Sequence, residues 1–137
     1  MIKKVHHIGI AVRDLKESVA LFEKLLGVKA HITEIPCQQV TEAVFKTGDG
    51  TEIDLLEAMG PDSAVGKFLE IRGEGLHHIA LQVDDLDAEL KAMEEKGVRL
   101  IDKEGREGAA GQIGFLHPKS VNGVLVELVQ VREMEGH

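Results

Sequence analysis

The sequence predicts an α+β fold that consists of two tandem βαβββ modules. Residues 5–15 recur as residues 76–86 at an offset of 71, with six of the eleven positions identical. Residues 50–57 recur as residues 123–130 at an offset of 73. An internal repeat indicates a duplicated structural unit. In each copy the apolar pattern changes from strand-like alternation to helical spacing and back, which gives the order strand, helix and three short strands.

The first half begins with a strand over residues 4–12, in which aliphatic side chains alternate with others. A helix over residues 15–26 follows, because apolar residues recur there at spacings of four and three. Asp14 precedes this helix as the expected N-cap, and Gly27 follows it where a left-handed C-terminal cap is expected. Three strands complete the module, near residues 29–35, 40–47 and 51–57.

The second half repeats this order after a linking helix near residues 63–71. It predicts a strand over 76–83, a helix over 86–96, and strands over 98–102, 111–117 and 123–131. The glycine-rich segment 103–111 is expected to be a mobile loop, and the tail 132–137 is expected to be frayed. We expect a single domain over residues 1–137, with modules at 1–60 and 75–137 and a linker at 61–74.

Composition excludes several classes of function. The formal net charge of −8 opposes binding to a phosphate backbone, and the 4 Phe, without Trp or Tyr, supply few surfaces for base stacking. We therefore expect no nucleic-acid partner. The chain holds no apolar run of the roughly 20 residues that cross a bilayer, so we expect no membrane partner. A single cysteine, Cys37, fits a reducing compartment, and we expect a cytoplasmic protein.

Side-chain alternation along the strands predicts a metal site. His7 and its repeat equivalent His78 point to faces that otherwise carry small or polar residues, opposite the aliphatic faces. Asp54 and Glu127 occupy equivalent positions in later strands, where burial of a carboxylate is costly unless it is paired or binds a metal. Two imidazoles and two carboxylates suit a divalent ion such as Co, Mn, Fe, Ni or Zn.

Histidines on strands also have a structural interpretation. A lone strand histidine is more often a packing residue than a ligand, and the case for a metal depends on four ligand-type residues in register across the duplication. His6 and His77 share the parity of the aliphatic positions, so we interpret them as packing or edge residues. His117 is interpreted as structural.

The motifs that surround these residues resemble the vicinal oxygen chelate superfamily, which includes glyoxalase I and extradiol dioxygenases. The resemblance lies in the duplicated His-His-Ile strands, in residues 53–57 and in residues 125–128. It implies paired βαβββ modules whose sheet curves into a cup around a metal, with His7, Asp54, His78 and Glu127 as ligands. Relatives carry Gln or Glu at the position of Asp54, so this shorter side chain binds the metal directly or through a water.

Within the superfamily the chain is most similar to the methylmalonyl-CoA epimerases, in residues 61–69, 75–80 and 115–119. This resemblance implies interconversion of (R)- and (S)-methylmalonyl-CoA by removal and return of the α-proton. It implies Glu42 and Glu127 as the acid–base pair. It also implies a divalent metal cofactor, cobalt first, with manganese, nickel, zinc or iron as alternatives.

The acyl-CoA partner requires contacts for its anionic groups. Ser63 and Lys67 lie near a predicted helix N-terminus, where anions are stabilised, and Lys119 is a third candidate. An ordinary cap and ordinary surface lysines are the alternatives. We expect a homodimer, because small modules commonly cover their sheet edges and apolar faces with a second copy. The alternative functions are a glyoxalase I-like or other metal-dependent enzyme of the superfamily, and a non-catalytic ligand-binding or resistance protein.

Overall fold

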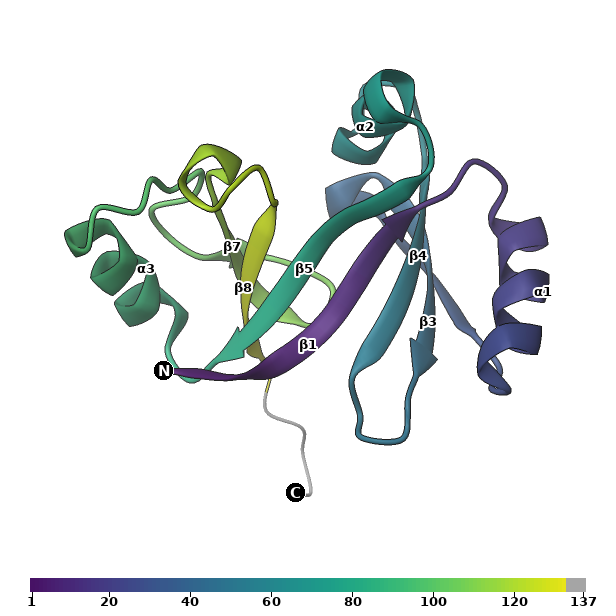
Figure 1. The fold of residues 1–137 in the computed structure, drawn as a ribbon, viewed down its shortest axis with the longest axis horizontal. Helices are drawn as coiled ribbons and strands as arrows, with labels where there is room; N and C mark the ends of the chain where they lie inside the picture. The colour runs from purple at the N-terminus through teal and green to yellow at the C-terminus, as the bar shows by residue number, and fades with distance from the viewer. Residues whose placement is uncertain (133–137) are drawn as a thin grey trace. The chain divides into compact units, whose positions relative to one another are not determined.

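The computed structural model describes residues 1–132. The chain divides into two compact units, one of residues 7–77 and one of residues 1–6 with the chain from residue 78 on. The α-helices and strands are β1 (Ile2–Ala11), α1 (Leu15–Leu26), β2 (His31–Ile35), β3 (Val40–Lys46), β4 (Glu52–Ala58), α2 (Ala64–Arg72), β5 (Gly75–Val83), α3 (Leu86–Glu95), β6 (Arg106–Glu107), β7 (Gly111–Leu116) and β8 (Val126–Val131). Figure 1 labels all of them except β2 and β6.

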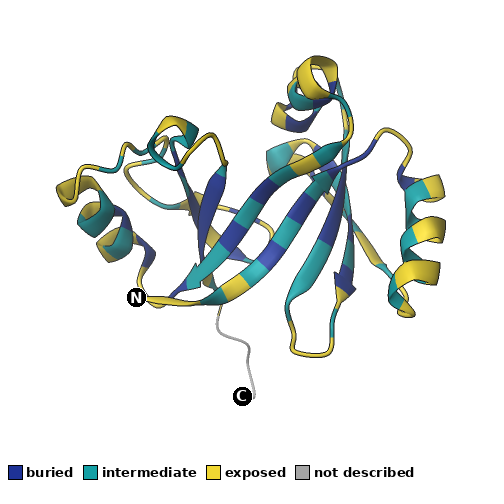
Figure 2. Cartoon of the chain, in the orientation of Figure 1, coloured by how far each residue is buried: buried dark blue, intermediate teal, exposed yellow. Residues whose placement is uncertain are grey.

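The unit of residues 7–77 contains a four-stranded sheet in the order β2-β3-β4-β1. The residues of β1 from His7 on pair in parallel with β4, while β4 with β3 and β3 with β2 are antiparallel pairs. The helix α1 packs on one face of this sheet through a core cluster of Val12, Leu15, Ala43, Phe45 and Leu55. In Figure 2 the side of α1 that faces away from the sheet is exposed. The predicted strand–helix–three strand order is confirmed.

The second unit repeats this arrangement, with a sheet in the order β5-β8-β7-β6. The strands β5 and β8 are parallel, and β7 is antiparallel to both β8 and β6. The helix α3 packs on one face through Leu86 and Leu90, in a cluster with Val83, Leu116, Val126 and Leu128. The chain therefore has the α+β character that the sequence predicts. Its assignment to a single domain stays a prediction.

Strand register preserves the duplication residue by residue. Asp54 lies opposite Gly9 in the first sheet, and its repeat equivalent Glu127 lies opposite Ala80 in the second. Opposed residues on neighbouring strands share a face of the sheet. The two carboxylates therefore occupy the same structural position in the two modules.

Each helix is also held to its own sheet by equivalent bonds. Asp14 and Asp85 are the N-caps of α1 and α3, and their side chains accept hydrogen bonds from the third residue of each helix. A second acceptor comes from the last strand of each module. The Glu57 carboxylate accepts from the backbone N–H of Leu15 at 2.8 Å, and the Gln130 amide oxygen accepts from that of Leu86 at 2.9 Å. These bonds satisfy N–H groups that a helix leaves without an internal partner.

One predicted strand is wrong. Residues 98–102 form no strand, and Leu100 makes only an isolated bridge to Leu116. The Asp102 carboxylate accepts hydrogen bonds from the backbone N–H of Phe115 in β7 and from the Arg106 side chain. A side-chain acceptor therefore takes the place that a backbone carbonyl would have in a regular strand pair. The second strand of this module is instead the two-residue β6, inside the segment expected to be a mobile loop.

Two further sequence expectations concern the chain's ends and helices. Most of the tail that was expected to be frayed, residues 133–137, lies outside the described residues. Within residues 1–132, no helix combines the length and apolar character needed to cross a membrane.

The linking helix predicted near residues 63–71 is α2, which begins at Ala64. Through Val65 and Leu69 it packs on the face of its sheet that carries His7 and Asp54.

Candidate metal and acid–base site

The first histidine–carboxylate pair consists of His7 on β1 and Asp54 on β4. His7 Nδ1 and Asp54 Oδ2 are 3.9 Å apart, and only 9% and 4% of the two residues is exposed. Both lie on the face of the sheet opposite α1, because Ile10 and Leu55 of the same strands pack with the helix. Sequence alternation placed His7 on the face opposite the aliphatic residues, and the structure brings Asp54 beside it on that face.

The second pair consists of His78 on β5 and Glu127 on β8. His78 Nε2 lies 3.4 Å from Glu127 Oε1, and the two residues are 7% and 5% exposed. Phe115 of β7 lies opposite Glu127 in the sheet, and its ring meets the His78 imidazole edge-on with centroids 6.2 Å apart. The Phe115 ring thus packs against His78 on the face that carries Glu127.

Glu42 lies on the same face as His7 and Asp54. It occupies β3 opposite Leu56 of β4, and Val44, two residues further on, lies opposite Asp54. Burial, and to a lesser extent the negative charge of Glu52, raises the pKa of Glu42 to about 7. A carboxyl group with a pKa near neutrality can both accept and release a proton at physiological pH.

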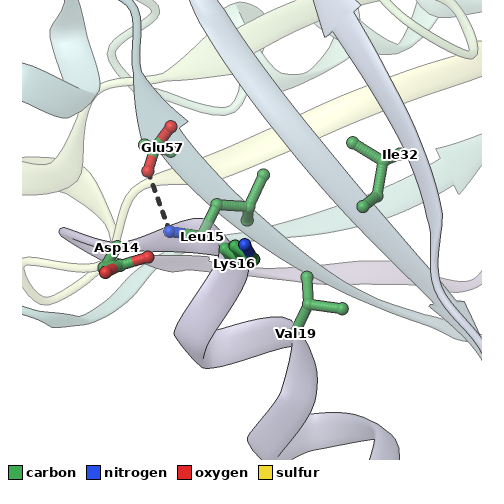
Figure 3. Close-up of a pocket in the computed structure, with 6 residues that line it drawn as sticks. All are labelled: Asp14, Leu15, Lys16, Val19, Ile32 and Glu57. Atoms are coloured by element: carbon green, nitrogen blue, oxygen red, sulfur yellow. Dashed lines mark hydrogen bonds between the residues drawn. The ribbon is translucent and has the colours of Figure 1, made fainter.

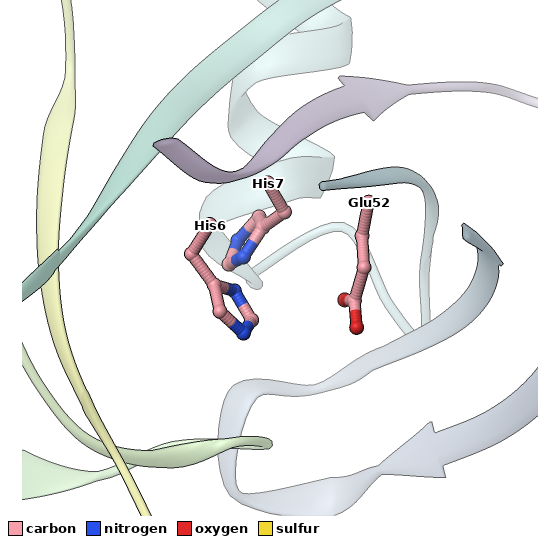
Figure 4. Close-up of side chains that lie close together, drawn as sticks. All are labelled: His6, His7 and Glu52. Carbon is pink, nitrogen blue, oxygen red and sulfur yellow. The ribbon is translucent and has the colours of Figure 1, made fainter. Parts of the chain in front are cut away.

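Glu52 is a site residue that the sequence interpretation missed. It is the first residue of β4 and lies directly opposite His7 in the parallel pair. Ligand atoms of His7 and Glu52 lie within 4.8 Å of one another, and Figure 4 shows both side chains together with His6. Alternation along the strand places Glu52 on the same face as Asp54, but its position opposite His7 follows from strand pairing that the sequence does not show.

His77 does not belong to the site. Its ring packs edge-on against Phe68 of α2, with centroids 5.0 Å apart. Burial lowers the pKa of His77 to about 4, so the imidazole is neutral at physiological pH. The interpretation of His77 as a packing residue is confirmed.

Ser63 and Lys67 lie at the start of α2. The buried Ser63 hydroxyl donates to the Gly60 carbonyl at 2.9 Å and accepts from the Gly66 N–H at 3.0 Å. It therefore caps the helix, and its part in binding substrate stays a prediction. Lys67 is exposed on the same helix, so its side chain is accessible to an anion.

Lys119 is also exposed, in the 3₁₀ turn Pro118–Ser120. The backbone N–H of Lys119 donates to Nδ1 of His117 at 3.1 Å. His117 therefore caps this turn, which confirms its structural role. Lys119 keeps its side chain available, and its contact with substrate stays a prediction.

A cavity of about 310 Å³ lies on the other face of the first sheet, between α1 and β2 (Figure 3). Its lining includes the acids Asp14 and Glu57 and the cation Lys16, and Glu57 already accepts the hydrogen bond of Leu15. The cavity lies on the α1 side of the sheet, opposite the face that carries His7 and Asp54, so it is separate from the candidate site.

Comparison with known proteins identifies the family. The model of the glyoxalase/bleomycin resistance protein/dioxygenase superfamily matches residues 6–115. The chain belongs to this superfamily. Its α+β modules are those of the superfamily's glyoxalase-type fold, so the fold expected from the resemblance is confirmed.

Relatives of this superfamily member include several methylmalonyl-CoA epimerases. The mitochondrial methylmalonyl-CoA epimerase of Dictyostelium discoideum is 41% identical over 132 residues, which cover 93% of this chain and 78% of that protein. A crystal structure of methylmalonyl-CoA epimerase from Mycobacterium tuberculosis superposes with a TM-score of 0.91 at 35% identity, over 96% of this chain and 90% of that one. A methylmalonyl-CoA epimerase in complex with methylmalonyl-CoA and NH4+ matches all of both chains at 40% identity, with a TM-score of 0.88. The similarity to epimerases expected from the motifs is confirmed.

The superfamily is metal-dependent, and the donor atoms of this member fit a divalent transition ion. Each module supplies one imidazole nitrogen and one carboxylate, all less than 10% exposed. Buried groups of these types are borderline-hard ligands that suit zinc, cobalt, nickel, manganese and iron. The structure therefore contains a candidate His/Glu metal site.

Proposed function

We propose that this chain is a methylmalonyl-CoA epimerase. The observation that carries the proposal is Glu42, whose pKa is raised to about 7 on the same sheet face as the buried His7–Asp54 pair. Similarity to epimerases over more than nine tenths of the chain supports the substrate. An acidic hydrogen between a thioester and a carboxylate needs a base of this kind.

We propose that His7, Asp54, His78 and Glu127 hold one divalent cation, with cobalt as the first choice. When bound, the ion would supply positive charge near the oxygen on which negative charge develops. The duplicated register supports this assignment, because it places the two carboxylates at equivalent positions, each beside a histidine. Asp54, one methylene shorter than Glu127, binds directly or through a water.

The proton chemistry is assigned to Glu42 and Glu127. In one direction Glu42 removes the α-hydrogen as a proton, and the electron pair of the broken C–H bond moves toward the thioester carbonyl. Return of a proton from the other carboxylate, to the opposite side of the α-carbon, completes the inversion. Burial suits Glu42 to this role, because it disfavours the charged base and so strengthens its affinity for a proton.

Further proposals concern the contacts of the acyl-CoA, the oligomeric state and the location of the protein. Lys67 and Lys119 are proposed to contact anionic groups of the acyl-CoA, because both side chains are exposed cations. Ser63 is proposed to contribute indirectly to this binding, because it caps the start of the helix that carries Lys67. A homodimer and a cytoplasmic location remain predictions from the sequence.

Isotope exchange tests the function directly. Cobalt-loaded protein and one epimer of methylmalonyl-CoA are incubated in D2O, and the α-carbon is followed by NMR and chiral analysis. We expect deuterium at the α-carbon together with racemisation. A glyoxalase-type enzyme or a ligand-binding protein would leave the α-hydrogen in place, and that result would refute the proposal.

A further inference from the structure

Glu52, the first residue of β4, lies next to His7, one of the proposed metal ligands. It is directly opposite His7 in the parallel β1–β4 pair, whereas Asp54 is opposite Gly9. Ligand atoms of Glu52 and His7 lie within 4.8 Å of one another, and Figure 4 shows the Glu52 side chain beside that of His7. Both side chains therefore reach the same region of one sheet face.

This spacing suits two ligands of one ion. Metal–nitrogen and metal–oxygen bonds are about 2.0–2.2 Å long, so two ligands of one ion are separated by up to about 4 Å. A glutamate side chain can shorten the remaining gap by rotation. Its extra methylene also extends the carboxylate further from the strand than Asp54 can reach.

Glu52 adds negative charge to a face that already carries two other acids. Lys46 lies opposite Glu52 in the antiparallel β3–β4 pair. The negative charge of Glu52 also acts on Glu42 and contributes to the raised pKa of that carboxyl group. Three carboxylates, those of Glu42, Glu52 and Asp54, thus share a face, and like charges at close range are unfavourable without a cation.

The duplication shows that the fold does not require this acid. At the offset of 73 the counterpart of Glu52 is Leu125, an aliphatic residue, in the module that carries the longer carboxylate Glu127. The module with the shorter Asp54 is the one that carries Glu52. The additional acid therefore occurs where the predicted ligand has the shortest reach.

We propose that Glu52 is a further carboxylate ligand of the divalent cation, on the His7 side of the site. The inference rests on the proposed function for the presence of that cation. The proposal adds a fifth ligand to the four already proposed. In this arrangement Glu52 binds the cation directly, because the shorter Asp54 side chain extends less far from the strand.

Calorimetric titration of metal-free protein with Co2+ tests the proposal. The variants are Glu52→Ala and, as a matched control, Glu34→Ala, which removes an exposed carboxylate from β2 of the same unit. We expect Glu52→Ala to weaken Co2+ binding by about tenfold or more, since even indirect partners of a metal contribute about 10–100-fold. The visible absorption bands of bound Co2+ should also change, because they report the ligand set.

The outcomes separate this inference from the proposed function. Equal Co2+ affinity and equal spectra for wild type and Glu52→Ala would overturn the role of Glu52, while isotope exchange by the wild type would leave the epimerase assignment standing. A wild-type protein that binds no Co2+ would also overturn the role of Glu52 as a ligand. Weaker binding by Glu34→Ala to the same extent would also count against it, because the effect would then be one of general charge.

Discussion

Substitution of Glu42 by glutamine is expected to lower the rate of α-hydrogen exchange by about 10²–10⁴-fold, the usual contribution of one acid–base group. Glutamine has nearly the same size and preserves the packing on β3, but it cannot take a proton from carbon. Binding of Co2+ is expected to remain, because Glu42 is not among the proposed ligands. The measurement is deuterium uptake by methylmalonyl-CoA with cobalt-loaded protein.

The matched control for this substitution is Glu34→Gln, an exposed glutamate on the neighbouring strand β2. It should exchange hydrogen at the wild-type rate. Exchange by Glu42→Gln at the wild-type rate would remove Glu42 from the mechanism, whereas a loss of Co2+ binding would show that the substitution disturbs the metal site instead.

The Glu42→Gln substitution is also expected to change the thermal stability of the protein in a pH-dependent way. Because the pKa of Glu42 is raised to about 7, the folded protein favours the protonated acid. Its stabilising contribution is complete below the pKa of about 4.5 expected in the unfolded chain and is lost as the pH rises through 7. Metal-free Glu42→Gln should therefore gain thermal stability over the wild type at pH 8 relative to pH 5. A constant difference between the two proteins across this range would contradict the raised pKa.

Removal of the His78 imidazole is expected to have the largest effect on the metal. His78→Ala should weaken Co2+ binding by more than the roughly 10–100-fold that indirect partners contribute, because it removes a buried ligand and leaves Glu127 without its histidine. Isotope exchange should fall with it. Calorimetry with Co2+ and far-ultraviolet circular dichroism together separate loss of metal from loss of fold.

His31→Ala provides the control for that variant, since His31 is an exposed histidine on β2. Its affinity for Co2+ should equal that of the wild type. If His78→Ala binds Co2+ as tightly as His31→Ala does, the His78–Glu127 pair is a structural ion pair and not part of a metal site.

Most of the fold could be predicted from the sequence because each strand and helix pattern of the first module occurs again in the second. The alternation around His7 and His78 assigned the helix-facing and site-facing sides of β1 and β5, and the core clusters confirm that assignment. The offset between Asp54 and Glu127 likewise predicted their equivalent register. The first result depends on local periodicity and the second on the internal repeat, and the sequence contains both explicitly.

Other features depend on side chains that compete with the backbone or act across strands. The Asp102 carboxylate accepts the backbone N–H of Phe115 where a strand carbonyl would be expected, and no periodic pattern reveals a carboxylate of this kind. Glu52 was missed because its relation to His7 comes from the parallel β1–β4 register, which joins residues 45 positions apart. The duplication could not point to it, since its counterpart is Leu125.

Crystals of the cobalt-loaded protein, measured at the cobalt absorption edge, test most directly whether the duplicated modules serve one ion. We expect one anomalous peak per chain, about 2.0–2.2 Å from ligand atoms of His7, His78 and Glu127. Two separate peaks, one at each histidine–carboxylate pair, or a peak at a single pair alone, would contradict a shared metal centre.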